Sequence, residues 1–301
     1  FLAHTDAQVG RLREALKDME QYDNTLFVYI VGDNGASAEG GLTGSTNYMG
    51  DLQGLVSDVA RYADAPQTLS GENTYAHYNA GWAWGTNAPF QWTKQVASHL
   101  GGTRNPMVLT WPGRIRDRGG LRSQFGHVND IVPTILEVTG IALPASVNGV
   151  EQQPLDGVSL AYSFDDAKAT ERHTTQYFEI FGNRAIYHEG WMASAFRGRA
   201  PWAVISGARN EDFAADRWEL YDLRADFSQD TDLAAREPAM LHELQQLFAR
   251  EATANDVLLH NPTPENMRFP SLTGDRTRFS YRAGTIGVAE KEAPNTKTRS
   301  H

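Results

Sequence analysis

The sequence predicts an α/β fold, in which a mostly parallel sheet flanked by helices is followed by a small antiparallel α+β subdomain. One observation is the apolar run Leu26-Phe-Val-Tyr-Ile-Val31, which is typical of a strand buried on both faces. Another is the helical spacing of apolar residues just before that run. After about residue 173 the pattern changes to short apolar segments separated by turn residues, which is typical of an antiparallel sheet.

Composition narrows the function classes. The 301 residues suffice for about two domains, and 41% hydrophobic residues can build a core. A net charge of −10 disfavours nucleic acid and anionic membranes as partners. No apolar run reaches the ~18 residues of a membrane span, and no signal peptide is visible. Cysteine is absent, which excludes disulfides and a cysteine nucleophile. Because the first residue is Phe1 rather than Met and a predicted helix follows almost at once, we expect the chain to be part of a longer protein.

The first half contains the elements of the predicted parallel sheet. The spacing of Val9, Leu12, Leu16 and Met19 predicts a helix over residues 5–21, and strand 26–31 follows it. Residues 36–80 are polar, with a short helix near 48–61; they form either a lid over the end of the strand or a plain surface excursion. A second short buried strand, 107–113, ends at Pro-Gly.

A helix over 128–139 completes this half. Its predicted inner face is Ile131, Ile135 and Val138, and Gly140 is expected at its C-terminal cap. The predicted first domain is 1–165.

The second half contains the predicted antiparallel sheet. Its strands are expected at 175–180, 183–187, 191–196 and 218–221. A helix at 238–252, with Pro238 in its first turn, follows them. We therefore expect a subdomain over 166–258. Residues 259–301 are rich in Pro, Thr, Arg and Lys, which favours an extended tail.

The candidate binding residues directly follow strand 26–31. Gly32-Asp33-Asn34-Gly35 lies where open α/β sheets bind ligands, just beyond the carboxyl end of a strand. The carboxylate of Asp33 and the amide of Asn34 offer oxygen ligands, which suit Ca²⁺ or Mg²⁺. The alternative is ordinary turn chemistry, because Asn and Gly tolerate positive φ.

Several motifs occur in one order along the chain. They are Asp23-Asn24-Thr25-Leu26 to Gly35 with Glu39-Gly40-Gly41, Trp92-Thr-Lys94 to Gly101-Gly102-Thr-Arg104, Trp111-Pro-Gly113, His127 to Leu136, and Glu219-Leu-Tyr221-Asp222-Leu223 with Asp232-Leu233. Together they resemble the arylsulfatases, members of the alkaline phosphatase superfamily, from residue 6 to about 250. The tail from 265 resembles that of a subfamily of bacterial arylsulfatases, for which periplasmic and cytoplasmic locations both remain open.

The resemblance implies a sulfatase / alkaline-phosphatase-like fold and a sulfuric ester hydrolase that acts on a small-molecule sulfate ester. It implies a divalent cation, usually Ca²⁺, with Asp33 and Asn34 as the downstream pair of ligands. Lys94 matches the lysine that contacts the sulfate group. The spacing from Lys94 to Gly101 is one residue longer than in many family members, so His99 competes for the role. A surface lysine and structural histidines at His99 and His127 are the alternatives.

The chain also departs from the family. Sulfatases use a formylglycine made in a Cys/Ser-x-Pro-x-Arg motif, and neither that motif nor the first metal motif is present. We therefore expect a downstream half, with the formylglycine and the other metal ligands supplied upstream. Two other hypotheses stay open: a phosphate or phosphonate ester hydrolase on the same scaffold, and an inactive scaffold fragment. The aromatic residues at 82–92 hint at an aryl group in the substrate, although core packing explains them equally well.

Overall fold

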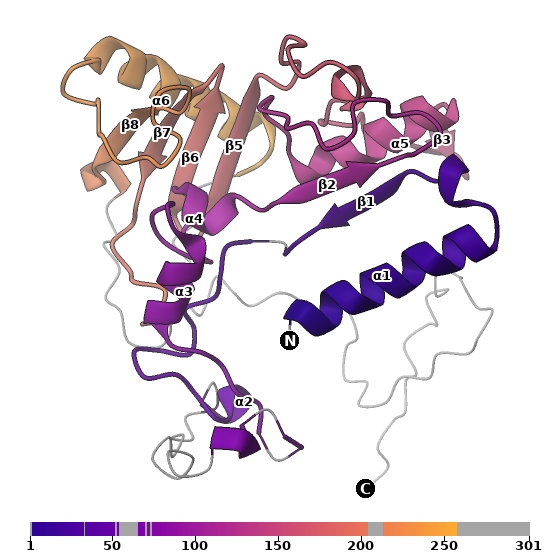
Figure 1. Cartoon of the computed structure of the whole chain (residues 1–301). Helices are drawn as coiled ribbons and strands as arrows, with labels where there is room; N and C mark the ends of the chain where they lie inside the picture. Colours follow the sequence, from indigo (N-terminus) through magenta and orange to yellow (C-terminus); the bar gives the residue numbers. More distant parts are fainter. Residues whose placement is uncertain are drawn as a thin grey trace, which may run out of the picture. The chain divides into compact units, whose positions relative to one another are not determined.

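The computed structural model describes residues 2–32, 34–51, 53, 66–69, 71–72, 74–203 and 213–257 (Figure 1). The α-helices of this part are α1 Leu2–Asp18, α2 Tyr48–Asp51, α3 Ala80–Asn87, α4 Leu100–Thr103, α5 Ile131–Thr139 and α6 Pro238–Ala254. Its strands are β1 Phe27–Ile30, β2 Met107–Thr110, β3 Ser146–Val147, β4 Val150–Glu151, β5 Thr175–Ile180, β6 Asn183–His188, β7 Trp191–Ala195 and β8 Trp218–Asp222. Of the predicted helix 48–61, only the α2 residues are described as helical, and the predicted tail lies outside the described residues.

Strand β1 pairs with β2, and the two strands run antiparallel (Figure 1). Phe27 lies opposite Thr110, and Ile30 lies opposite Met107. The parallel pairing that we predicted for this part of the sheet is therefore wrong for these two strands. The reason is the path of the chain between them: the amide of Gly35 bonds the carbonyl of Gly102 at 3.0 Å, so β2 starts beside the end of β1 and runs back along it.

The burial predicted for these strands is also wrong among the described residues. No residue of β1 or β2 is buried, and Val108 is 57% exposed. Among the described residues, β1 and β2 pair only with each other, so no strand lies at either edge of the pair. No described element covers both faces of the pair. Helix α1 contains the predicted apolar spacing, yet none of its residues is buried.

Helix α5 has the predicted end, and two of the three residues of its predicted inner face, Ile131 and Val138, are partly buried. Gly140 follows it in the left-handed conformation, with φ 68°, as expected of a C-terminal cap. The buried residue of the helix is Thr134, whereas Ile135 is 43% exposed. The Thr134 hydroxyl donates to the carbonyl of Asp130 and accepts the amide of Leu160, so these hydrogen bonds bury Thr134 on the same face as Ile131 and Val138.

The predicted antiparallel sheet and its helix are confirmed. Strands β5, β6, β7 and β8 are adjacent in this order, and each pair is antiparallel. Helix α6 lies along this sheet and packs its apolar stripe on it (Figure 1). The core between them consists of Ile186, Ala193, Leu220, Leu244, Phe248 and Ala252. The alternation of side chains along each strand leaves the other face of the sheet for a second contact.

That second contact is made by the segment before β2. Leu100 packs against Ala185 and Met192, which neighbour Ile186 and Ala193 and therefore face away from α6. Residues 258–301 lie outside the described residues. The domain boundaries predicted at 165 and 258 remain predictions. Within the described part, no helix has both the length and the apolarity for a membrane crossing.

The α6 contact gives a stability prediction. Leu244 is 0% exposed in the core, so Leu244→Ala should lower the free energy of unfolding of the 301-residue chain by about 2–5 kcal/mol. Urea unfolding followed by far-UV circular dichroism measures this change. Leu12→Ala is the matched control, because Leu12 is 60% exposed on α1 and its loss should change stability by less than about 0.5 kcal/mol. Equal effects of the two substitutions would contradict the assignment of this core.

Candidate functional site

The turn after β1 is fixed by close backbone contacts. A Cβ at Gly35 would overlap the carbonyl oxygen of Gly101, so this position accepts only glycine without a backbone shift. The side chain of Asn87 accepts the amide of Ala36 at 3.0 Å and donates to the carbonyl of Gly101 at 2.7 Å. Residues 34–36 therefore lie directly against the start of α4.

Of the two predicted metal ligands, one is described. Asn34 lies in this turn, is partly buried and has an interaction partner. Asp33 lies outside the described residues. In the part of the chain that the structure describes, no three His, Asp or Glu side chains gather as a cation site would require. The amide of Asn34 would supply one of the 6–8 oxygen ligands that Ca²⁺ takes.

Lys94 reaches the same turn by its backbone. Its amide donates to the carbonyl of Ala36 at 3.1 Å, two residues from Asn34. Its ammonium lies 3.3 Å from a carboxylate oxygen of Glu39, and its side chain is 37% exposed. The structure thus brings the backbone of Lys94 to the turn that contains Asn34, although 60 positions separate the two residues in the sequence.

Glu39 is the centre of a small polar cluster. Its carboxylate accepts hydrogen bonds from the Tyr48 hydroxyl at 2.6 Å, from the Gln95 amide at 2.6 Å and from the Lys94 ammonium. Burial acts to raise the pKa of Glu39, but the hydrogen bonds from Tyr48 and Gln95 and the charge of Lys94 outweigh it and lower the pKa to about 2. The carboxylate is therefore ionised throughout the neutral range.

Gln95 connects this cluster to the C-terminal subdomain. It has a positive φ of 78°, which is uncommon for a residue other than glycine. Its carbonyl accepts the side-chain amide of Asn183 at 2.8 Å, and its side-chain oxygen accepts the Arg199 guanidinium at 3.0 Å. Backbone strain of this kind persists only where surrounding contacts fix it, and it concentrates at functional sites.

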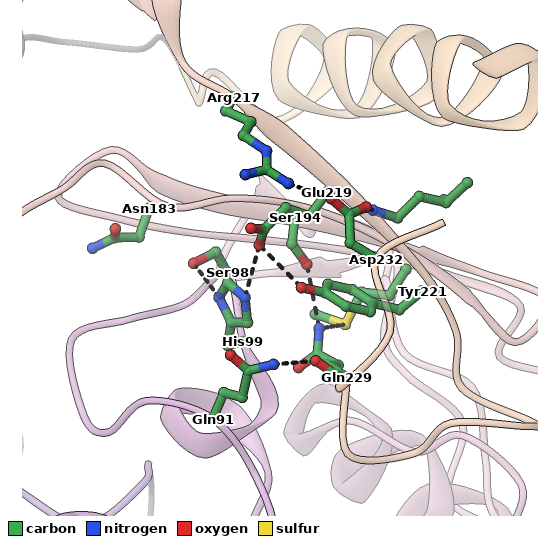
Figure 2. Close-up of polar contacts among 12 residues, drawn as sticks. Gln91, Ser98, His99, Asn183, Ser194, Arg217, Glu219, Tyr221, Gln229 and Asp232 are labelled. Atoms are coloured by element: carbon green, nitrogen blue, oxygen red, sulfur yellow. Dashed lines mark hydrogen bonds and ion pairs between the residues drawn. The ribbon is translucent and has the colours of Figure 1, made fainter. Parts of the chain in front are cut away.

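His99, the predicted competitor of Lys94, lies in a different environment. Figure 2 shows it between the segment 91–98 and the four-stranded sheet, and it is 1% exposed. One ring nitrogen lies 2.9 Å from the Ser98 hydroxyl and the other lies 3.2 Å from the Glu219 carboxylate. Both nitrogens thus have protein partners, which is the arrangement of a structural histidine.

Gln229 is the second connection in this network (Figure 2). It is fully buried, and its side-chain oxygen accepts the amide of Leu100 at 2.7 Å. Its side-chain nitrogen donates to the Ser194 hydroxyl, and its carbonyl accepts the side chain of Gln91. These bonds hold the segment that contains Lys94 against the sheet.

His127 also has structural contacts. It caps the turn before α5: its amide donates to the Asp130 carboxylate at 2.7 Å, and its ring accepts the amide of Asn129. Burial lowers the pKa of His127. Asp130 is fully buried and bonds His173 at 2.7 Å, so this pair belongs to the packing of α5.

Sequence reasoning missed four residues around Lys94. They are Glu39, Tyr48, Gln95 and Arg199. Glu39 is part of the Glu39-Gly40-Gly41 motif, but nothing in that motif identifies the lysine as its partner. Gln95 adjoins Lys94, whereas the positions of Tyr48 and Arg199 give no signal. The aromatic residues at 82–92 lie in different environments. Trp82 is 68% exposed, whereas Trp92 stacks on Phe196 with ring centres 4.0 Å apart.

Comparison with known proteins agrees with the resemblance. The family model described as Sulfatase matches residues 1–141. An uncharacterized sulfatase of Schizosaccharomyces pombe is 28% identical over 241 residues, which cover 79% of this chain and 40% of the relative. An arylsulfatase of Klebsiella aerogenes is 30% identical over 163 residues, covering 54% of this chain and 32% of the relative. The chain thus spans less than half the length of these two curated relatives.

A solved structure shows the same fold. The sulfatase PsFucS1 from Pseudoalteromonas sp. superposes with a TM-score of 0.53 at 15% sequence identity, covering 83% of this chain and 41% of that structure. The predicted sulfatase-like α/β fold class is therefore confirmed for the part that this chain contains.

The His99–Glu219 contact gives a pH prediction. The hydrogen bond from His99 is the largest cause that lowers the pKa of Glu219 below its ordinary 4.5. A carboxyl group whose pKa is lower in the folded chain than in the unfolded chain stabilises the fold at pH values above its unfolded-state pKa. It loses that contribution as the pH falls through its folded-state pKa. Glu219→Gln should therefore destabilise the chain at pH 5.5, and the difference from the unmodified chain should shrink toward pH 3.5.

Urea unfolding at both pH values measures this difference, and exposed Glu137→Gln on α5 is the control. A destabilisation by Glu219→Gln that is equal at the two pH values would contradict the role of its ionised form.

Proposed function

We propose, from the premise that residues 1–141 belong to the sulfatase family, that the protein containing this chain is an arylsulfatase-type hydrolase of sulfate monoesters. The observation that carries the proposal is the bond from the Lys94 amide to the Ala36 carbonyl, 3.1 Å long. It brings the lysine that matches the family's sulfate contact to the turn that matches its metal-binding motif. The substrate class in this proposal is a small-molecule sulfate ester.

Lys94 supplies positive charge to the ester in this proposal. Three non-bridging oxygens of a sulfate monoester share one negative charge, and more charge develops on the leaving oxygen during hydrolysis. A fixed ammonium stabilises that charge best where water is partly excluded. The overall charge of −10 makes a local cation necessary for binding an anion.

A divalent cation, Ca²⁺ or Mg²⁺, would supply further charge stabilisation to the same group. Asp33 and Asn34 would be this chain's contribution to holding it. Residues upstream of this chain would complete the ligand shell and supply the formylglycine nucleophile.

A phosphate or phosphonate ester hydrolase is the second candidate from the sequence, because the scaffold and the metal motif suit either ester. The nucleophile discriminates: a Cys/Ser-x-Pro-x-Arg motif upstream supports sulfate, and a bare Thr or Ser supports phosphate. Turnover of 4-nitrophenyl sulfate and 4-nitrophenyl phosphate by the full-length protein compares the two directly.

The role of Lys94 is tested by substitution in the full-length protein. Lys94→Ala should lower kcat/KM for 4-nitrophenyl sulfate by roughly 10²- to 10³-fold, because one charged contact to the transition state is lost. Lys17→Ala is the control, since Lys17 lies on α1 with its side chain 44% exposed and pairs with Glu14. Loss of less than threefold on Lys94→Ala would contradict the proposal.

The metal role of Asp33 is tested by activity and by calorimetry. In the full-length protein, Asp33→Asn should lower turnover of the aryl sulfate at least about 100-fold and weaken Ca²⁺ binding, because a charged ligand becomes neutral. Exposed Asp18→Asn at the end of α1 is the control. The 301-residue chain alone should bind Ca²⁺ weakly or not at all. Unchanged Ca²⁺ affinity in Asp33→Asn would exclude this residue as a ligand.

A further inference from the structure

The Glu39 carboxylate has an arrangement that binding an anionic ester does not by itself explain. It lies beside the ammonium of Lys94, yet its negative charge opposes the approach of a sulfate group. Its side chain is only 11% exposed, so burial adds a desolvation cost. A largely buried carboxylate beside the lysine proposed to bind the anion therefore needs a function that offsets both costs.

The geometry around Glu39 indicates what that role is. One oxygen accepts the Tyr48 hydroxyl and the Lys94 ammonium, and the other oxygen accepts the Gln95 side chain. Tyr48 and Gln95 thus fix the plane and position of the carboxylate, and the carboxylate in turn fixes the ammonium. A lysine ammonium has three donors on a flexible four-carbon stem, so a single anchored partner restricts its position and leaves donors for a ligand.

We propose that Glu39 is a positioning residue for Lys94, whose backbone amide bonds the 34–36 turn, and that it holds the ammonium in the place where it meets the sulfate ester. This inference rests on the proposed function, which assigns Lys94 to that ester. Glu39 itself does not touch the substrate in this proposal; it acts through Lys94. The positioning reduces the conformational freedom that the lysine would otherwise lose when the substrate binds.

The backbone of Lys94 and Gln95 supports the same reading. The Lys94 amide is bonded to Ala36, and Gln95 is held at a positive φ by the bond from Asn183 to its carbonyl. Arg199 holds the oxygen of the Gln95 side chain, so its nitrogen faces Glu39. The stem of Lys94 therefore starts from a fixed backbone and ends at a fixed carboxylate.

The test is a double-mutant cycle in the full-length protein, with 4-nitrophenyl sulfate as the substrate. Glu39→Gln keeps the size of the side chain and removes its charge. We expect kcat to fall on the order of tenfold because the ammonium loses its anchor. We expect KM not to rise, because a charge that opposes the anionic substrate is removed at the same time.

The cycle separates positioning from a structural role. If Glu39 acts through Lys94, Glu39→Gln should change kcat less than twofold when Lys94 is already alanine. The same reduction in both backgrounds, or an unchanged kcat in the single variant, would overturn the proposal. Glu171→Gln is the matched control, because Glu171 accepts a tyrosine hydroxyl, that of Tyr187, at the same 2.6 Å but has no lysine partner among the described residues. It should leave kcat unchanged.

A second measurement does not depend on sulfatase activity. Amine acetylation of the 301-residue chain, followed by mass spectrometry, reports how available Lys94 is to a reagent. Lys94 should react several-fold faster in Glu39→Gln than in the unmodified chain, with Lys17 as the internal reference. Equal rates would overturn the contact between Glu39 and Lys94. Absence of aryl-sulfate turnover with the expected change in labelling would instead mean that the proposed function is wrong and that the Glu39 anchor is correct.

Discussion

The close approach of two backbone segments, Gly35 against Gly101, is the constraint on which the candidate site depends. Neither position tolerates a side chain: a Cβ at Gly35 would meet the Gly101 carbonyl, and one at Gly101 would meet the carbonyls of Gln91 and Trp92. Because these backbones touch, the loop that precedes α4 lies against the turn after β1. Lys94 reaches Ala36, and Glu39 reaches Lys94, as consequences of this contact.

The C-terminal sheet takes part in this arrangement through its second face. On one face, Ile186 and Leu220 pack against α6, as in any two-layer α+β unit. On the other face, Gln229 and Glu219 bond Leu100 and His99, so buried polar groups connect the sheet to the segment that follows Lys94. Such groups are costly unless each has a partner, and this requirement favours one register between segment and sheet.

Local sequence patterns predicted which segments form helices and strands better than they predicted how these elements pair and which residues they bury. The antiparallel strands and α6 follow from alternation, turn residues and helical spacing, which are properties of neighbouring residues. The direction of β2 relative to β1 depends on where the intervening chain returns, and Gly102 sets that by bonding Gly35. Likewise, Ile135 has the spacing of a buried residue, but hydrogen bonds bury its neighbour Thr134 instead, on the face of the partly buried Ile131 and Val138.

The sequence by itself determined the family resemblance, the order of the motifs and the choice of Lys94, because each of these depends on residue types at fixed spacings. It also left His99 open between two roles. Only the tertiary structure decided that His99 is buried between Ser98 and Glu219, and that Glu39, Tyr48 and Gln95 surround the lysine. The physical reason is that a hydrogen bond requires atoms within about 3 Å in space. Glu39 and Lys94 come together because the backbones of Gly35 and Gly101 touch and bring the two segments side by side.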